Sequence, residues 1–329
     1  MSEPLLQVRS LDVSYAVQHR GRRVRLRALS GVSFELMPGE ALAVIGESGS
    51  GKSTLGRALL RLIDVDGGQI RFRGEDLLAL RGERLRQMRR HLQMIFQDGL
   101  SALDPRMQIS AILGEPLQVF RPELTRAARD AAAAAMLERV GLTASQLTRY
   151  PHEFSGGQAQ RIGIARALIV GPELMVCDEP LSALDVSIKS QIAALLKSTQ
   201  QQLRLALLFI AHDLPAVQAL CDRVLVLYLG RVMEIAPSAA LFRRAMHPYT
   251  RALLAAVPIP DPRRARARRT PPLAGEVPSA LAPPSGCVFR TRCAWAIERC
   301  ARELPELRAV GDSLVACHRA EELSGQAQR

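Results

Sequence analysis

The chain has 329 residues, 48% of them apolar and 23% charged, and its 44 lysine and arginine residues exceed the 32 acidic ones to give a formal net charge of +12. This length predicts two domains, or one large domain with an appendage, and the composition excludes disordered, collagen-like and small disulfide-rich proteins. No apolar run approaches the roughly 18 residues of a membrane-spanning helix, and the N-terminus lacks signal-peptide features. We therefore expect a cytosolic chain that is neither exported nor membrane-spanning.

The N-terminal part of the chain is expected to consist of short strands and one helix. Apolar stretches separated by turn residues such as Pro38 and Gly39 predict strands over 5–15, 32–36, 41–45 and 70–73. A helical pattern over 53–63 directly follows a glycine-rich loop. This part is therefore expected to be mainly β-structure, with one helix behind the loop.

The pattern is helical from about residue 77 to 150 and then alternates between helices and strands. Helices are expected over 158–170 and 187–203, and strands over 174–177, 206–211 and 224–228. Strands that alternate with helices indicate a parallel α/β core, into which the residues after 77 are inserted as a helical segment. Cys177 and Cys221 lie in apolar, strand-like surroundings and are expected to be packing residues.

A proline-rich stretch over 258–286 is expected to be a linker. It contains five arginines between residues 263 and 269, RRARARR. This run fits a solvated linker, and it also fits a patch that touches anionic lipid.

Residues 46–53, GESGSGKS, match the phosphate-binding loop G-x-x-x-x-G-K-[ST], and they lie between an expected strand and an expected helix. Glycines let backbone N–H groups curl around phosphate oxygens, and the N-terminus of the helix adds partial positive charge. Lys52 is expected to reach the β- and γ-phosphates, and the Ser53 hydroxyl to ligate Mg²⁺. The loop therefore predicts a nucleotide-binding protein.

Two acids, Asp178 and Glu179, follow the apolar strand expected at 174–177. An aspartate at the end of a buried strand beside a phosphate loop can hold Mg²⁺, usually through water. Glu179, one residue further on, is in a position to polarise the attacking water. Paired with the loop, the two acids predict hydrolysis of the nucleotide.

A second turn, FSGGQ at residues 154–158, precedes a helix. Ser155 is expected to cap that helix, and its hydroxyl, the glycine amides and the helix N-terminus together form a possible second anion site. The two turns are about 100 residues apart, so one chain cannot easily bring both to one nucleotide. Two chains arranged head-to-tail can do so, because each then gives a loop to one nucleotide and the second turn to the other.

The order of the loop, SGGQ, DEP and SALD resembles that of the ATP-binding subunits of ABC transporters, and the resemblance covers residues 5 to about 255. It implies an α/β P-loop fold with a RecA-like core, an antiparallel β-subdomain and an inserted helical subdomain at about 77–155, all within residues 1–257. By position, Tyr15 is similar to the aromatic residue that stacks on adenine, and Asp185 to a residue that contacts the opposite loop across the dimer. Gln97 is similar to the glutamine that links Mg²⁺ and water to the helical subdomain, and His212 to the histidine that contacts the γ-phosphate.

The resemblance thus implies ATP and Mg²⁺ as ligands, with the following site residues. ATP is bound by Tyr15, Gly46, Glu47, Ser48, Gly49, Ser50, Gly51, Lys52, Ser53 and Thr54, and the ATP of the opposite chain by the signature Ser155, Gly156, Gly157 and Gln158. Mg²⁺ is held by Ser53, Gln97 and Asp178, hydrolysis is catalysed by Glu179 and His212, and Asp185 couples the dimer. Phe154 and Ala159 depart from the family pattern, which often has leucine and a basic residue there.

The segment HPYTRALL at residues 247–254 and the cysteine-containing tail resemble the ATPases of oligopeptide/dipeptide importers. QDGLSALDPRM after Phe96 also resembles theirs, although Gly99 stands where proline is common. The resemblance implies a second, related ATPase, two transmembrane permeases, an extracytoplasmic solute-binding protein, and a peripheral position at the cytoplasmic face of the bacterial inner membrane. Importers of nickel and other small solutes belong to the same group, so the solute stays open.

The C-terminal extension, residues 287–329, carries four cysteines with the spacing C-x5-C-x6-C-x16-C: Cys287, Cys293, Cys300 and Cys317. This is not the paired C-x2-C spacing of common zinc sites, and disulfides are not expected in a reducing cytosol. Four thiolates can hold a [4Fe–4S] cluster, and some proteins with a similar tail carry one. A cluster, zinc and reduced packing cysteines are the three alternatives.

The positive charge also fits an ABC ATPase that acts on DNA or the ribosome, but such proteins carry long coiled-coil or zinc insertions, or two ATPase domains. This chain has one such domain with a compact helical insertion. A kinase or GTPase would have no role for SGGQ, SALD or His212. We therefore expect no nucleic-acid partner and an ATPase that powers transport.

Overall fold

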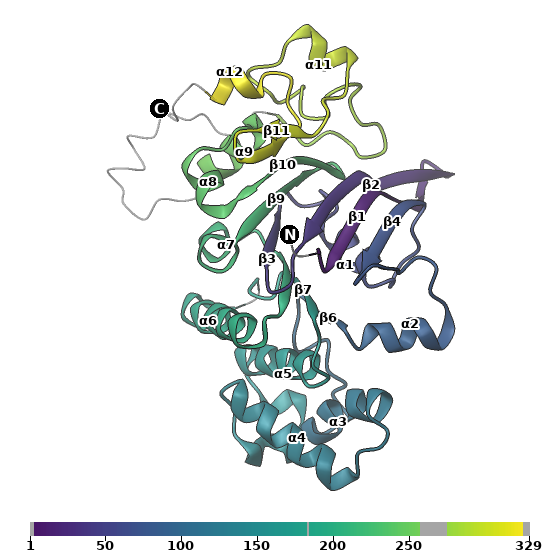
Figure 1. Ribbon diagram of the computed structural model, residues 1–329, viewed down its shortest axis with the longest axis vertical. Helices are drawn as coiled ribbons and strands as arrows, with labels where there is room; N and C mark the ends of the chain where they lie inside the picture. Colours follow the sequence, from purple (N-terminus) through teal and green to yellow (C-terminus); the bar gives the residue numbers. More distant parts are fainter. Residues whose placement is uncertain (1–2, 183, 257–274, 325–329) are drawn as a thin grey trace.

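The computed structural model describes residues 3–182, 184–256 and 275–324 (Figure 1). A four-stranded sheet has the order β2-β1-β4-β5, and an eight-stranded sheet the order β11-β12-β10-β9-β3-β8-β7-β6. The strands are β1 (Leu6–His19), β2 (Arg22–Leu36), β3 (Ala41–Ile45), β4 (Gly67–Phe72), β5 (Glu75–Asp76), β6 (Leu92–Ile95), β7 (Leu174–Asp178), β8 (Ala206–Ile210), β9 (Arg223–Tyr228), β10 (Arg231–Pro237), β11 (Arg308–Val310) and β12 (Ser313–Val315).

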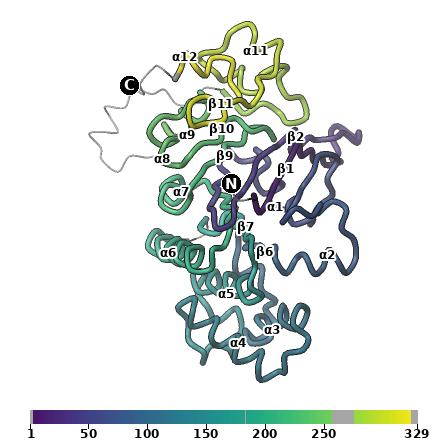
Figure 2. Tube along the Cα trace, in the orientation of Figure 1, coloured from purple at the N-terminus to yellow at the C-terminus, as the bar shows by residue number. Residues whose placement is uncertain are grey.

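Most helices lie around the eight-stranded sheet. The helices between residues 109 and 139 form a separate group at the end of the molecule opposite the C-terminal segment (Figures 1 and 2). The helices are α1 (Lys52–Leu59), α2 (Gly82–Arg89), α3 (Ile109–Phe120), α4 (Arg126–Arg139), α5 (Gly156–Leu168), α6 (Val186–Leu203), α7 (Leu214–Leu220), α8 (Ser238–Arg243), α9 (Pro248–Ala255), α11 (Glu298–Arg302) and α12 (Ala320–Ser324), with the 3-10 turns η1 (Ala144–Thr148) and η2 (Pro151–Glu153). None of the helices in the described ranges has the length and apolar composition needed to span a bilayer.

The parallel part of the eight-stranded sheet, β9-β3-β8-β7-β6, forms the centre of the molecule. Every residue of β3 is buried, as expected for a strand that is covered on both faces. Ala41, Ala43 and Ile45 belong to one apolar cluster, and Leu42 and Val44 belong to the other. The expected parallel α/β core is confirmed, and the carboxyl ends of its strands meet at one edge, where ligands of such sheets bind.

One segment expected to be helical is a strand. Leu92–Ile95 forms β6, which pairs in parallel with β7 and ends the eight-stranded sheet. The helical prediction is wrong here, because four residues are too few to show a period and pairing with β7 decides their conformation. The helices that follow, α3 and α4, pack against each other and against α5.

The C-terminal segment extends the eight-stranded sheet. β12 pairs antiparallel with both β10 and β11, and the N–H of Ala316 donates to the carbonyl oxygen of Met233 at 2.9 Å. This segment therefore packs directly on the core, at the upper end of Figure 1. Residues 258–274 of the expected linker, including the arginine run, lie outside the described residues. The expected domain boundaries stay predictions.

Candidate active site

The phosphate-binding loop connects the buried end of β3 to α1. A Cβ atom at Gly46 would lie 2.1 Å from the carbonyl oxygen of Leu227 on β9, and one at Gly51 would lie 2.5 Å from that of Ala28 on β2. Gly51 also has a φ of +104°, a conformation that glycine adopts at little cost. Glycine is therefore needed at both positions for the loop to pass this close to its neighbouring strands.

Lys52, the first residue of α1, folds back over the loop. Its Nζ donates hydrogen bonds to the carbonyl oxygens of Gly46 at 2.8 Å and Glu47 at 2.9 Å. Burial lowers the pKa of this ammonium group, and three carboxylates oppose that shift: Glu179, Asp178 and Glu47. An ammonium group held only by carbonyl oxygens can exchange them for phosphate oxygens when a nucleotide binds.

Ser53 and Asp178, two of the residues expected to hold Mg²⁺, are joined directly. The Ser53 hydroxyl donates to Oδ1 of Asp178 at 2.8 Å, which links α1 to the end of β7. Burial raises the pKa of Asp178, and the bond from Ser53 opposes that shift. A hydroxyl and a carboxylate are oxygen ligands of the kind that Mg²⁺ prefers. The two side chains therefore fit the ion that the sequence predicts.

Glu179 lies one residue beyond β7 within reach of two polar side chains. Its Oε2 accepts a hydrogen bond from Nε2 of Gln97 at 3.1 Å and lies 3.3 Å from Nδ1 of His212. The backbone of Glu179 has a φ of +48°, in the left-handed region that few residues other than glycine occupy. Such strained positions cluster at functional sites. The structure thus brings together Glu179, expected to polarise the water, Gln97, expected to link Mg²⁺ and water to the helical subdomain, and His212, expected to contact the γ-phosphate; these roles stay predictions.

Tyr15 reaches the start of α1 from the antiparallel sheet. Its hydroxyl donates to the Thr54 hydroxyl at 3.3 Å. The aromatic ring therefore lies beside the helix that follows the phosphate-binding loop. This position suits a ring that stacks on the base of a nucleotide whose phosphates occupy the loop.

The signature turn caps α5, as the sequence predicts. The N–H of Gln158 donates to the Ser155 hydroxyl at 3.4 Å, and the N–H of Ser155 donates to the Gln158 side chain at 3.1 Å. Asp185 occupies the N-cap position of the neighbouring helix α6. Among the described residues, no hydrogen bond or ion pair joins positions 155–158 to positions 46–54. Within the described part of one chain, the structure therefore shows no direct polar contact between the signature turn and the phosphate-binding loop.

Comparison with known proteins matches two parts of the chain to one class of transporter. Residues 29–182 match the family model "ABC transporter", and residues 233–300 match "Oligopeptide/dipeptide transporter, C-terminal region". The chain is 48% identical over 321 residues to the oligopeptide transport ATP-binding protein OppF of Haemophilus influenzae, which covers 96% of this chain and 97% of that protein. The chain belongs to the oligopeptide/dipeptide family of ABC-transporter ATP-binding proteins.

Other members of this ABC family are similarly related. A putative peptide import ATP-binding protein of Brucella ovis is 52% identical, over 93% of this chain and 95% of its own length. A solved dimeric ATP-binding cassette in a post-hydrolysis state with ADP and Pi has a TM-score of 0.64 and 25% identity, and covers 71% of this chain and 98% of its own. CbiO1 of Clostridium perfringens has a TM-score of 0.63 at 25% identity, over 73% and 91% of the two chains. These matches confirm the predicted ABC-type fold and the ATPase activity.

The tail of this ABC ATPase places its four cysteines around one small pocket. The pocket is lined by the free thiols of Cys287, Cys293, Cys300 and Cys317. Burial raises the pKa of the Cys287 thiol to about 11 and that of Cys293 to about 12. Within the described ranges, no group of three or more His, Cys, Asp or Glu side chains is arranged to hold a metal ion. Four thiols are donors that a [4Fe–4S] cluster or zinc accepts, but the structure does not arrange them to hold either, so cluster, zinc and reduced packing cysteines all stay predictions.

Two residues that hold the phosphate loop of this ABC ATPase from outside were missed by the sequence analysis. The N–H of Glu47 donates to the Tyr249 hydroxyl at 2.9 Å, and the Glu47 carboxylate pairs with Arg292. Tyr249 belongs to the segment that signalled the importer subgroup, but its contact with the loop has no local pattern. Tyr249 reaches the loop from α9, which packs on β10, and Arg292 reaches it from the C-terminal segment.

Proposed function

We propose that this chain pairs head-to-tail with a second, related ATPase, binds two ATP molecules between the two chains, and so drives peptide import through two transmembrane permeases. The observation that carries the proposal is the convergence of Lys52, Ser53, Asp178 and Glu179 at one edge of the sheet, with the signature turn elsewhere in the chain. Because the signature turn of this chain is not joined to its own phosphate-binding loop, a second chain is needed to supply a signature turn to the ATP bound there. The dimeric state of a similar solved cassette supports this arrangement.

Each composite site separates phosphate binding from proton transfer. When bound, Mg²⁺ neutralises charge on the β- and γ-phosphates, and Ser53 and Asp178 would hold it with Gln97. Lys52 contacts the same phosphates, and Tyr15 stacks on the base. The signature turn of the second ATPase covers the γ-phosphate from the other side. This chain thus gives its phosphate-binding loop to one ATP molecule and its signature turn to the other.

Proton transfer falls to Glu179, which accepts a proton from the attacking water. Gln97 donates a hydrogen bond to its carboxylate, and His212 lies 3.3 Å from the same oxygen, where it would contact the γ-phosphate. Asp185, at the N-cap of α6, contacts the phosphate loop of the second ATPase. Hydrolysis then weakens the interface and the dimer reopens.

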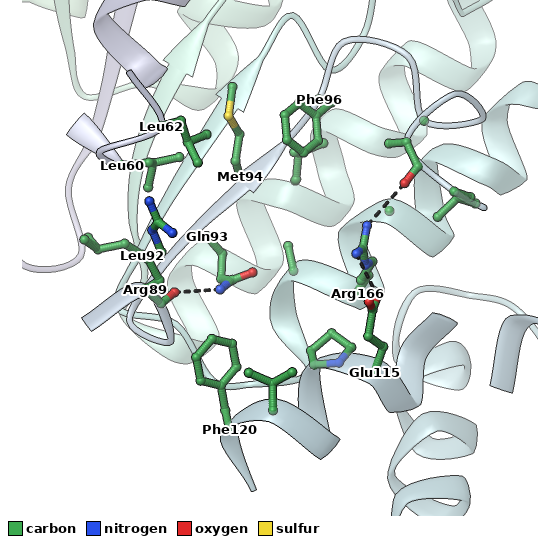
Figure 3. A pocket seen from close by; sticks show the side chains of 18 residues that line it. Leu60, Leu62, Arg89, Leu92, Gln93, Met94, Phe96, Glu115, Phe120 and Arg166 are labelled. Atoms are coloured by element: carbon green, nitrogen blue, oxygen red, sulfur yellow. Dashed lines mark hydrogen bonds and ion pairs between the residues drawn. The ribbon is translucent and has the colours of Figure 1, made fainter. Parts of the chain in front are cut away.

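A groove beside Gln97 suits the attachment of a permease (Figure 3). Its volume is about 330 Å³, and its lining comes from β6, α3, α5, the last residue of α2 and the segments that follow α1 and β6. Leu62, Phe96 and Val119 line it and are exposed although apolar. An exposed apolar groove of this kind marks a site for a protein partner. Because Phe96 precedes Gln97, motion of a segment in the groove would reach the bond to Glu179.

We expect Val119→Asp to reduce the amount of permease that purifies with the chain by about tenfold, because a charge would be buried at the centre of an apolar contact. ATP affinity should not change. Leu203→Asp, at an exposed apolar position at the end of α6, is the matched control. Equal recovery of permease with both variants would show that the groove is not the attachment site.

Affinity purification of the chain from native membranes, followed by mass spectrometry, tests the assembly. We expect two permeases and a second, related ATPase, which would also place the chain at the cytoplasmic face of the membrane. Loss of peptide uptake on deletion of the gene would establish the solute class, whereas loss of nickel uptake alone would favour the small-solute alternative. Recovery of ribosomal or DNA-repair proteins without a permease would overturn the transport proposal.

We further propose that the thiol pocket of the tail holds a [4Fe–4S] cluster. Support comes from the four cysteines that line it, although their side chains would have to rearrange to hold the cluster, since no three of them are arranged around a metal position in the described residues. The anaerobically purified chain is expected to contain about four iron atoms per molecule and to absorb light at about 400 nm. Loss of both signals after Cys300→Ser would locate the cluster. Zinc without iron would identify the alternative metal site, and absence of both metals would leave reduced packing cysteines.

A further inference from the structure

The acidic residue inside the phosphate-binding loop is paired with a residue of the C-terminal segment. Both oxygens of the Glu47 carboxylate are engaged by Arg292, whose Nη1 lies 2.6 Å from Oε2 and whose Nη2 lies 3.0 Å from Oε1. The Arg292 side chain is 5% exposed and the Glu47 side chain 24%. A two-bond pair between arginine and a carboxylate fixes direction as well as distance. This contact therefore holds the loop in one orientation relative to the tail.

Aromatic side chains enclose this ion pair. The Arg292 guanidinium lies 5.9 Å from the ring centre of Tyr228 and donates to its hydroxyl at 3.4 Å. Tyr228, Tyr249 and Phe289 pack with ring centres 4.6 to 5.4 Å apart. Because β9, α9 and the tail each supply one of these rings, the tail packs on the core beside the arginine. Its position is fixed before any ligand binds.

Glu47 is held at three points. Its N–H donates to the Tyr249 hydroxyl, its carbonyl oxygen accepts from Lys52, and its carboxylate is paired with Arg292. The same residue thus connects the tail to the lysine expected to contact phosphate. An unpaired carboxylate here would repel the phosphates of ATP, because like charges at short range and low exposure are weakly screened.

We propose that Arg292 is a positioning residue for nucleotide binding: it neutralises the Glu47 carboxylate and fixes the phosphate-binding loop, so the C-terminal segment completes the ATP site from outside. The inference rests on the assignment of the loop to ATP. It gives the tail a role in the ATPase cycle besides the metal binding proposed for its cysteines.

The test measures the affinity of the full-length chain for a non-hydrolysable ATP analogue with Mg²⁺ by calorimetry. Arg292→Ala is expected to weaken binding by about tenfold, because it leaves the carboxylate of Glu47 unpaired beside the phosphates. The double variant Glu47→Gln/Arg292→Ala should bind more tightly than Arg292→Ala but more weakly than wild type, because the repelling charge is gone while the loop is still not fixed by the tail. Arg292→Lys, which keeps the charge but not the two-bond geometry, should lie between wild type and Arg292→Ala.

Arg299→Ala, which breaks an exposed ion pair with Glu303 in the same tail, is the matched control and should bind like wild type. Unchanged affinity of Arg292→Ala would overturn the inference. A double variant as weak as Arg292→Ala would do so too, because the loss of affinity would then come from a disturbed tail and not from the unpaired charge of Glu47. Failure of the wild-type chain to bind the analogue would instead refute the loop assignment and the inference together.

Discussion

Glu179→Gln is expected to slow ATP hydrolysis by about 10²–10⁴-fold while ATP binding is retained, the usual scale for a positioned general base. Glutamine keeps the size of the side chain and can still accept the hydrogen bond from Gln97. It cannot take a proton from water. The strained φ of +48° at this position should persist, because the backbone N–H still donates to the carbonyl oxygen of Ile210 at 2.9 Å.

The rate is measured in the assembled ATPase pair, with the site of the second ATPase disabled. Glu173→Gln is the matched control, because Glu173 precedes β7 and pairs with Arg73 rather than with Gln97 or His212. That variant should hydrolyse ATP at nearly the wild-type rate. Near-normal turnover of Glu179→Gln would refute its role as base, and lost ATP affinity would assign it to binding instead.

Lys52→Ala is expected to weaken ATP binding by on the order of 10²-fold, because charge-assisted hydrogen bonds to phosphate are among the strongest in proteins. The loss should be larger than for the neighbouring loop residues. Lys52 is 7% exposed, its ammonium group donates to two carbonyl oxygens, and the negative charges of Glu179, Asp178 and Glu47 act on it. Removing it also leaves excess negative charge where the phosphates bind.

Calorimetry of the purified chain with Mg²⁺ and ATP measures this effect. Lys197→Ala is the matched control, because Lys197 also donates to a backbone carbonyl, that of Leu220 at 3.0 Å, but lies outside the site. Its variant should bind ATP with wild-type affinity. An unchanged affinity for Lys52→Ala would remove the loop from the binding site.

The sequence by itself identified the local parts of this protein. The phosphate loop, the two acids after β7 and the signature turn are short, and each depends on the geometry of a strand end or a helix start that its own residues specify. Their order along the chain was also sufficient to indicate an ABC ATPase. The structure places Ser53 against Asp178 and Glu179 against Gln97 and His212, as that reading requires.

Tertiary structure decided the features that depend on residues far apart in the chain. Leu92–Ile95 is a strand only because β7 lies beside it, and β12 joins the core sheet only through β10. The pairing of Arg292 with Glu47 spans 245 positions and leaves no local pattern that periodicity or spacing could detect. The physical reason is that motifs encode backbone conformation over a few residues, whereas contacts between segments depend on how buried surfaces pack. The sequence therefore predicted the chemistry of the site, and only the fold brought the tail against the phosphate-binding loop.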